Sequence, residues 1–226
     1  MATDGTFLGQ SGADHSFKIA TDVGTIGIGN SGDAANAVDD ITPSAFEEAN
    51  GSGSGSYEDF GAGMDGSMSL SYGNSDLLGT GISVAANYYP KLDGTTNNEK
   101  GSSTTDGSNA DSATSINVGI PLASLPVIGD TALGGMKITA GYEESDARLA
   151  TGYGKVGGTV AVNLPIGPLS VGYQKKGYQA KADAITETSR AFYKDDILGV
   201  AYAVNDSFAI SYNLYESVKH DHSVGN

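Results

Sequence analysis

Residues able to carry out acid–base, nucleophilic or metal chemistry are few in this chain. It contains three histidines, His15, His220 and His222, and no cysteine. None of the three belongs to a nucleophile motif with serine, and a His-x-His pair close to a chain end is more often part of a solvated loop than of a metal site. The sequence therefore predicts that the protein is not an enzyme.

Two other patterns have the composition of ligand sites. Residues 51–56 repeat Gly-Ser three times, but they lack the lysine and the strand-to-helix setting of a phosphate loop, and so indicate a flexible linker. Acidic pairs at 39–40, 47–48 and 195–196 supply the oxygen ligands that Ca²⁺ prefers. None of them has the EF-hand spacing, so the sequence predicts no cofactor and assigns no metal-ligand set, with Ca²⁺ as the alternative left open.

The overall composition limits the class of protein. The chain has 226 residues, with 12 Lys and Arg against 27 Asp and Glu, and a net charge of −15. Nucleic-acid binding is excluded, because affinity for phosphates depends on Lys and Arg. No apolar run approaches the roughly 18–20 residues of a membrane-spanning helix. The 33 glycines also argue against helices, since each costs about 1 kcal/mol relative to alanine. The chain is expected to be mostly β-structure.

Apolar residues alternate with small polar ones along most of the chain. In residues 68–72, Met-Ser-Leu-Ser-Tyr, every second residue is apolar. This period of two is typical of a strand with one apolar face. The pattern recurs about ten times, at 16–19, 26–28, 68–72, 82–88, 116–122, 136–142, 160–164, 169–173, 198–204 and 208–214.

The connections between these strands alternate in length. Short ones, rich in Gly, Pro, Asn and Asp, lie at 21–24, 74–76, 165–168 and 205–206. Long polar ones lie at 30–65, 91–113, 143–150 and 180–191. This spacing predicts an up-and-down antiparallel meander, with tight turns at one end and long loops at the other.

The second face of the strands indicates their surroundings. It carries mostly Ser, Thr, Gly, Ala and Asn, whereas the outward face of a water-soluble sandwich carries charged residues. Transmembrane barrels show this inverted arrangement, apolar toward lipid and polar toward the lumen. Tyrosines near the ends of the apolar stripes fit the aromatic girdle of such a barrel: Tyr72, Tyr88, Tyr142, Tyr173, Tyr202 and Tyr212.

Three segments resemble strands of the general bacterial porins, the diffusion channels of the Gram-negative outer membrane. Residues 23–30, Val-Gly-Thr-Ile-Gly-Ile-Gly-Asn, pass into 31–40 in the manner of the porin strand that ends in glycine and enters the third external loop. Residues 136–142 and 197–215 have the pattern of porin strands and a tight turn.

The resemblance implies a trimeric, transmembrane, antiparallel β-barrel, most often of sixteen strands, in the outer membrane of a Gram-negative bacterium. Its third loop folds inward and narrows a water-filled channel for small hydrophilic solutes and ions. Residues 1–226 would then be one barrel domain, incomplete at both ends, with about ten strands visible and 30–65 as the constriction loop. Membrane lipid and further copies of the chain, as a homotrimer, are the implied partners.

The resemblance also places charged residues on two sides of the constriction. The acidic side on the loop is Asp33, Asp39, Asp40, Glu47, Glu48, Glu58 and Asp59, and the basic wall is Lys137, Lys155 and Lys175, with Lys18 on a neighbouring strand. No lysine or arginine lies within 30–65. A field between opposed charges orients solutes, and the excess of acids on the loop predicts a preference for cations.

A secreted or surface-layer β-sandwich, serving as an adhesin or structural protein, is the alternative. Such proteins are equally acidic, rich in glycine and free of cysteine, and their apolar faces pack on each other in water. A dependence on detergent separates the two interpretations, because a soluble sandwich needs none.

Overall fold

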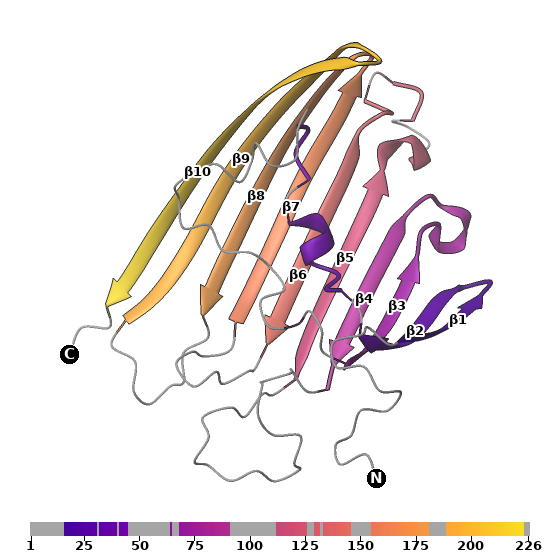
Figure 1. Cartoon of the computed structure of the whole chain (residues 1–226), viewed down its shortest axis with the longest axis vertical. Coiled ribbons are helices and arrows are strands. Elements are labelled where there is room, and N and C mark those ends of the chain that lie inside the picture. The colour runs from indigo at the N-terminus through magenta and orange to yellow at the C-terminus, as the bar shows by residue number, and fades with distance from the viewer. Residues whose placement is uncertain are drawn as a thin grey trace.

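The computed structural model describes residues 16–30, 32–39, 41–44, 64, 68–90, 112–125, 129–131, 133–145, 155–180 and 189–223, apart from the side chains of 155, 180, 189–191 and 221–223. Within these residues ten strands form one sheet in the order β1 to β10 (Figure 1). Each strand is antiparallel to the next along the chain, as in β1 with β2 and β9 with β10. The predicted all-β, up-and-down architecture is thus confirmed.

Each strand overlaps one of the alternating segments of the sequence. The strands are β1 (Ser16–Thr21), β2 (Gly24–Asn30), β3 (Met68–Asn74), β4 (Ser83–Tyr89), β5 (Ala113–Pro121), β6 (Lys137–Ser145), β7 (Lys155–Ile166), β8 (Leu169–Ala180), β9 (Ser189–Asn205) and β10 (Phe208–Ser223). Of these, β7, β9 and β10 extend well beyond the predicted 160–164, 198–204 and 208–214. Their length rises from 6 residues in β1 to 17 and 16 in β9 and β10. Tight turns join several pairs, and Gly167 in the β7–β8 turn has a φ of 59°, which glycine adopts without strain.

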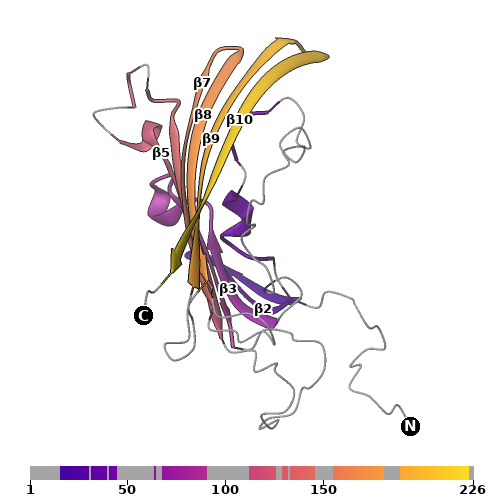
Figure 2. The same cartoon turned by 90° about the vertical axis from the view of Figure 1, so that its left-hand side faces the viewer.

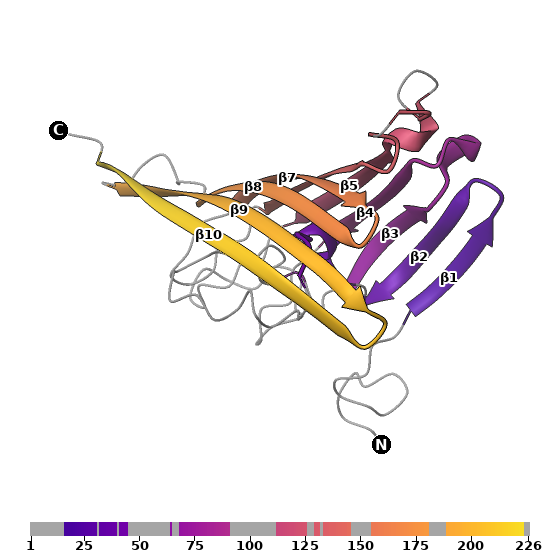
Figure 3. The same ribbon diagram turned by 90° about the horizontal axis from the view of Figure 1, so that it is seen from above.

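The sheet is strongly curved and open rather than closed into a barrel. Seen from above, it forms a trough in which β1 and β10 are the two edges (Figure 3). The two edge strands are unequal, with 6 residues against 16, so they could pair along only part of β10. The fold is therefore the wall of a barrel-like sheet, and its closure is not part of the described residues.

The two faces of the sheet differ as the alternation predicts. Large apolar side chains cover the convex outer face and remain exposed, for example Phe17 at 65%, Ile210 at 55% and Ile28 at 54%. Five of the six stripe-end tyrosines are exposed on this face: Tyr88, Tyr142, Tyr173, Tyr202 and Tyr212. The concave inner face carries small and polar residues. No second sheet covers the outer face within the described part of the chain.

Short 3-10 helices are the remaining elements. They are η1 (Asn36–Val38), η3 (Leu77–Gly79) and η4 (Leu122–Ser124). η1 belongs to the long connection after β2 and lies in the trough against the inner face of the sheet (Figure 2). No helix in the described ranges is long and apolar enough to cross a membrane.

Candidate functional site

A stretch of chain lies across the concave face of the sheet and is bonded to it along its length. It comprises residues 32–39 and 41–44, which follow β2 and include η1, and it is called the docked segment below. Its contacts begin on β5 and end on β10, so the segment crosses most of the trough. Side chains from β5, β7, β8 and β10 hold it in place.

The first anchor is on β5. The backbone N–H of Ala34 donates to Ser115 Oγ at 3.1 Å, and Asn117 Nδ2 donates to the carbonyl of Ala34 at 2.5 Å. Asp33 acts locally, since its Oδ1 accepts from the N–H of Ala35 at 3.0 Å. Ser115 is fully buried and Asp33 nearly so. The start of the segment is therefore fixed by two side chains of the sheet and one of its own.

Gln174 on β8 is the central anchor. Its Nε2 lies 2.9 Å from the carbonyl of Val38 and 2.7 Å from that of Asp39, and its Oε1 accepts from the N–H of Ile41 at 3.1 Å. The same Nε2 is 2.8 Å from Thr159 Oγ1 on β7. The Gln174 side chain is fully buried. One amide thus satisfies backbone groups at the end of η1 that would otherwise be buried without partners.

A buried ion pair lies beside the Gln174 side chain. Lys176 Nζ on β8 lies 2.6 Å from Asp39 Oδ1, and their side chains are only 2% and 6% exposed. Asp195 on β9 is the cross-strand neighbour of Lys176 and is also buried. Because buried charges require compensation, the Lys176–Asp39 pair fixes the segment in one position on the wall.

The far end of the segment, residues 41–43, lies on four residues that are neighbours across adjacent strands, and these four are called the cradle below. Asn163, Gly172, Gly199 and Asn213 are consecutive partners across β7, β8, β9 and β10. The two outer amides donate to backbone carbonyls of the segment, Asn163 to residue 41 at 2.9 Å and Asn213 to residue 43 at 3.1 Å. The two glycines between them leave room for the chain to pass.

The glycines beneath the segment are needed for its close approach. A Cβ at Gly199 would lie 2.7 Å from the carbonyl oxygen of Pro43, and one at Gly141 would lie 2.6 Å from Val38 Cγ2. Real Cβ atoms do not come this close to other heavy atoms. Small residues on the inner face therefore mark the path of the segment across the sheet.

A second part of the same long connection also meets the inner face. Met64 is 1% exposed and packs with Tyr89 on β4 and Ala113 on β5 in a small apolar cluster. Residues of 30–65 near both of its ends are thus buried against the sheet.

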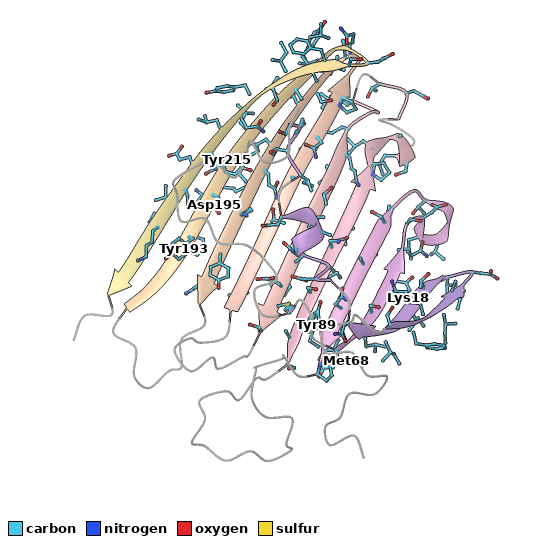
Figure 4. All side chains as sticks on the ribbon, in the orientation of Figure 1. Lys18, Met68, Tyr89, Tyr193, Asp195 and Tyr215 are labelled. Carbon is cyan, nitrogen blue, oxygen red and sulfur yellow. The ribbon has the colours of Figure 1, made fainter. Side chains whose placement is uncertain are left out.

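Two cavities flank the docked segment. One, of about 820 Å³, lies toward the β1 edge and is lined by Lys18, Asp33, Asn87 and Asn117 among others. The second, of about 470 Å³, is lined by residues 41, 43 and 44 of the segment and by Lys137. Lys18 and Asp195 mark opposite parts of this face in Figure 4. Both cavities therefore lie beside the segment at the end of the trough where the tight turns join the strands.

The predicted site residues fall into three groups. Asp33 and Asp39 lie on the docked segment, and Lys18 and Lys137 line the cavities beside it. Lys155 is on β7, but its side chain is outside the described residues. Five predicted acids also lie outside them: Asp40, Glu47, Glu48, Glu58 and Asp59.

The prediction that Lys175 belongs to the inner wall is wrong. Lys175 points to the outer face, where its Nζ is 2.7 Å from Asp196 Oδ1 and 3.4 Å from the hydroxyl of Tyr173. Tyr173 also hydrogen-bonds Asp196. Lys175 shares the parity of Tyr173 in the strand, so the inward lysine is its neighbour, Lys176.

The sequence reasoning also missed the amides that hold the segment. Asn117, Asn163, Gln174 and Asn213 are longer than the Ser, Thr, Gly and Ala that fill most of the polar face. Gln174 gave the clearest available signal, because its amide is longer than the Ser, Thr, Gly, Ala and Asn that fill most of this face and reaches a partner above the sheet.

The acidic pairs proposed for Ca²⁺ are partly corrected. Asp195 and Asp196 lie on opposite faces of β9, so they cannot hold one ion together. Asp39 is engaged by Lys176. The described residues contain no group of three His, Asp or Glu arranged for a metal, and the prediction for 47–48 lies outside them.

Comparisons with known proteins were made against families, curated proteins and solved structures. No family model and no curated protein matches the chain. Among solved structures it is similar to OmpTdeltaL8, a loop L8 deletion mutant of OmpT, an outer membrane protein of Vibrio cholerae. The identity is 16% and the TM-score 0.38, over 91% of this chain and 74% of that one. A likeness of this size carries no conclusion about activity.

The prediction that the protein is not an enzyme is corrected. It relied on the lack of a recognisable nucleophile or metal motif, whereas the similar structure is described only as an outer membrane protein. Barrel-like folds host channels and enzymes alike, so the fold excludes neither. Ruling out catalysis from the sequence was therefore wrong.

Proposed function

We propose that the chain forms the wall and the constriction of a water-filled channel in the outer membrane of a Gram-negative bacterium. Small hydrophilic solutes and ions would cross it by passive diffusion. The observation that carries this proposal is the docked segment, which is fixed by the buried Lys176–Asp39 pair on the polar side of a sheet whose other side is apolar. A polar lumen narrowed by an inserted segment is what a size-limited channel requires.

The exposed apolar face favours a membrane over the alternative of a soluble sandwich. A sandwich buries such a face against a second sheet. Here the outer positions of β10, Ile210, Tyr212 and Leu214, are at least half exposed, at 55%, 64% and 50%. In a bilayer the same residues form a lipid-facing band with tyrosines near its borders.

A membrane location sets a further requirement on the sheet edges. An edge with unpaired backbone N–H and C=O groups is not tolerated in lipid. We therefore expect β1 and β10 to pair with further strands, to a total near the sixteen of the general porins, and the closed barrels to assemble as trimers. A cross-linked purified sample that ran only as a monomer would contradict the trimer.

Ion selectivity tests the proposed lumen. The chain carries a net charge of −15, and the Lys176–Asp39 pair has no net charge, so the excess of acids over bases elsewhere in the chain sets the expected sign of the lumen. We expect the reconstituted protein to conduct in planar bilayers and to pass K⁺ more readily than Cl⁻. The measurement is the reversal potential under a tenfold KCl gradient. A reversal potential of the sign for anions would refute the cation preference.

The detergent dependence and the conductance of the same preparation distinguish the channel from the soluble sandwich. A channel protein is extracted from membranes only with detergent and gives discrete conductance steps. A protein that stays monodisperse without detergent and gives no steps would support the surface-layer sandwich instead.

A further inference from the structure

A groove on the outer face is not explained by the proposed channel. It has a volume of about 390 Å³, within the roughly 300–1,000 Å³ typical of ligand sites. It lies over β6 to β9 and is lined on this face by Ala140, Gly158, Val160, Gly177 and Phe192, with Lys175 and Lys194. The groove is thus apolar along its length and basic at one part of its rim.

Two glycines form the floor of the groove, at positions where the backbone conformation would accept other residues. Gly158 and Gly177 are direct cross-strand partners on β7 and β8, and neither has a positive φ angle. A Cβ at Gly158 would meet nothing nearer than a backbone oxygen at 3.7 Å. A Cβ at Gly177 would lie 3.4 Å from the Phe192 ring. A side chain would fit at Gly158, so the space there is left open on the surface.

The residues at the walls and rim of the groove determine which chemical class of ligand could bind in it. Val160 is 51% exposed and Phe192 38% exposed, so both present apolar surface to the outside. The ammonium of Lys175 forms an ion pair with Asp196, whereas Lys194 interacts with the same carboxylate electrostatically without an ion pair to it. An occupant that matches this surface has an apolar chain and an anionic head, with the head near Lys194.

We propose that this groove binds one anionic phospholipid, with an acyl chain over Gly158 and Gly177 and the phosphate at Lys194. The inference depends on the proposed function, because it requires the outer face to contact lipid. The phosphate contact is a charge-assisted hydrogen bond, and the acyl chain covers the exposed apolar surface of Val160 and Phe192.

Native mass spectrometry of the detergent-purified full chain tests the site. Dioleoylphosphatidylglycerol is titrated against dioleoylphosphatidylcholine, which has the same chains and no net charge. We expect one phosphatidylglycerol to be retained preferentially. Lys194→Gln should weaken its retention about tenfold, the loss of one charge-assisted hydrogen bond. Gly158→Val should weaken the retention of both lipids, because the valine side chain occupies the groove.

Two matched variants control for general effects. Lys18→Gln removes a lysine from the inner face, and Ala86→Val adds bulk to the outer face on β4, away from the groove. Both should retain phosphatidylglycerol as the parent does. Equal retention of the two lipids by the parent chain, or no change in Lys194→Gln and Gly158→Val, would overturn the inference.

Conductance of the same samples separates the two proposals. If the parent chain conducts but shows no lipid preference, the channel proposal stands and the lipid-site proposal is refuted. If the parent chain neither conducts nor needs detergent, both proposals are refuted.

Discussion

Replacing Lys176 by methionine is expected to release the docked segment from the wall and to raise the conductance of the channel. The substitution leaves Asp39 in a site where its side chain is 6% exposed, near the buried Asp195, without its cation. Removing one partner of a buried ion pair costs about 3–5 kcal/mol. The ratio of docked to released segment should therefore fall by roughly a hundredfold or more, since each 1.4 kcal/mol is a factor of ten in an equilibrium constant.

The measurement is single-channel conductance in planar bilayers, with current noise as a second readout. Lys18→Met removes a lysine from the same face on β1, seven strands away from Lys176 in the order of the sheet, and it should leave the noise unchanged. The double variant Lys176→Met with Asp39→Leu removes both charges and should recover part of the docking. A Lys176→Met channel with unchanged conductance and noise would show that the pair does not hold the segment.

A disulfide provides an independent test of the same contact. The chain has no cysteine of its own. A Cβ at position 141 would lie 2.6 Å from Val38 Cγ2, which puts the two Cβ atoms near the roughly 3.8 Å that a disulfide spans. Val38→Cys with Gly141→Cys, introduced into the Lys176→Met chain and oxidised, should restore the parent conductance. Reduction should raise it again.

Replacing Gly199 by valine should expel the far end of the docked segment. Its Cβ would lie 2.7 Å from the carbonyl oxygen of Pro43 and 2.9 Å from Thr42 Cβ. Backbone atoms cannot move aside as a flexible side chain does. Overpacking of this kind costs about 1–3 kcal/mol, and the strain can be relieved if residues 42–43 leave the cradle.

The expected result is faster labelling of a thiol on the segment. Pro43→Cys is the single cysteine of the test chain, and it should react with a water-soluble maleimide up to about a hundredfold faster when Gly199→Val is added. Gly73→Val is the matched control, because a Cβ at Gly73 meets nothing within 4 Å on the same face. Equal labelling rates in the two backgrounds would refute the cradle.

The strands could be predicted from the sequence because each one repeats a local pattern. In 68–72 the alternation of Met, Leu and Tyr with serine encodes both the extended backbone and its two faces. Tight turns such as 206–207 are equally local, since Asn205 Oδ1 accepts from the N–H of Ser207 at 2.9 Å. No knowledge of distant residues is needed for either.

The docking contacts could not be predicted in the same way. Gln174 meets the carbonyls of Val38 and Asp39 across 136 and 135 residues of sequence. Which inward amide meets the segment depends on the stagger of six strands, and a one-residue error turns a side chain to the other face. The error at Lys175 was of another kind, because the local alternation of Val171 and Tyr173 already places Lys175 on the apolar side and Lys176 on the inner side.

The order of the strands has a consequence for how the molecule forms. Every strand pairs with its neighbour in sequence, so the sheet can grow one strand at a time and each step closes only the connection between neighbours. The docked segment is synthesised after β2, yet its partners Ser115 and Asn213 lie 81 and 170 residues further along the chain from the groups they bind. Its complete binding surface exists only once β10 has joined the sheet. We therefore expect the trough to be built open and its narrowing to be completed late in folding.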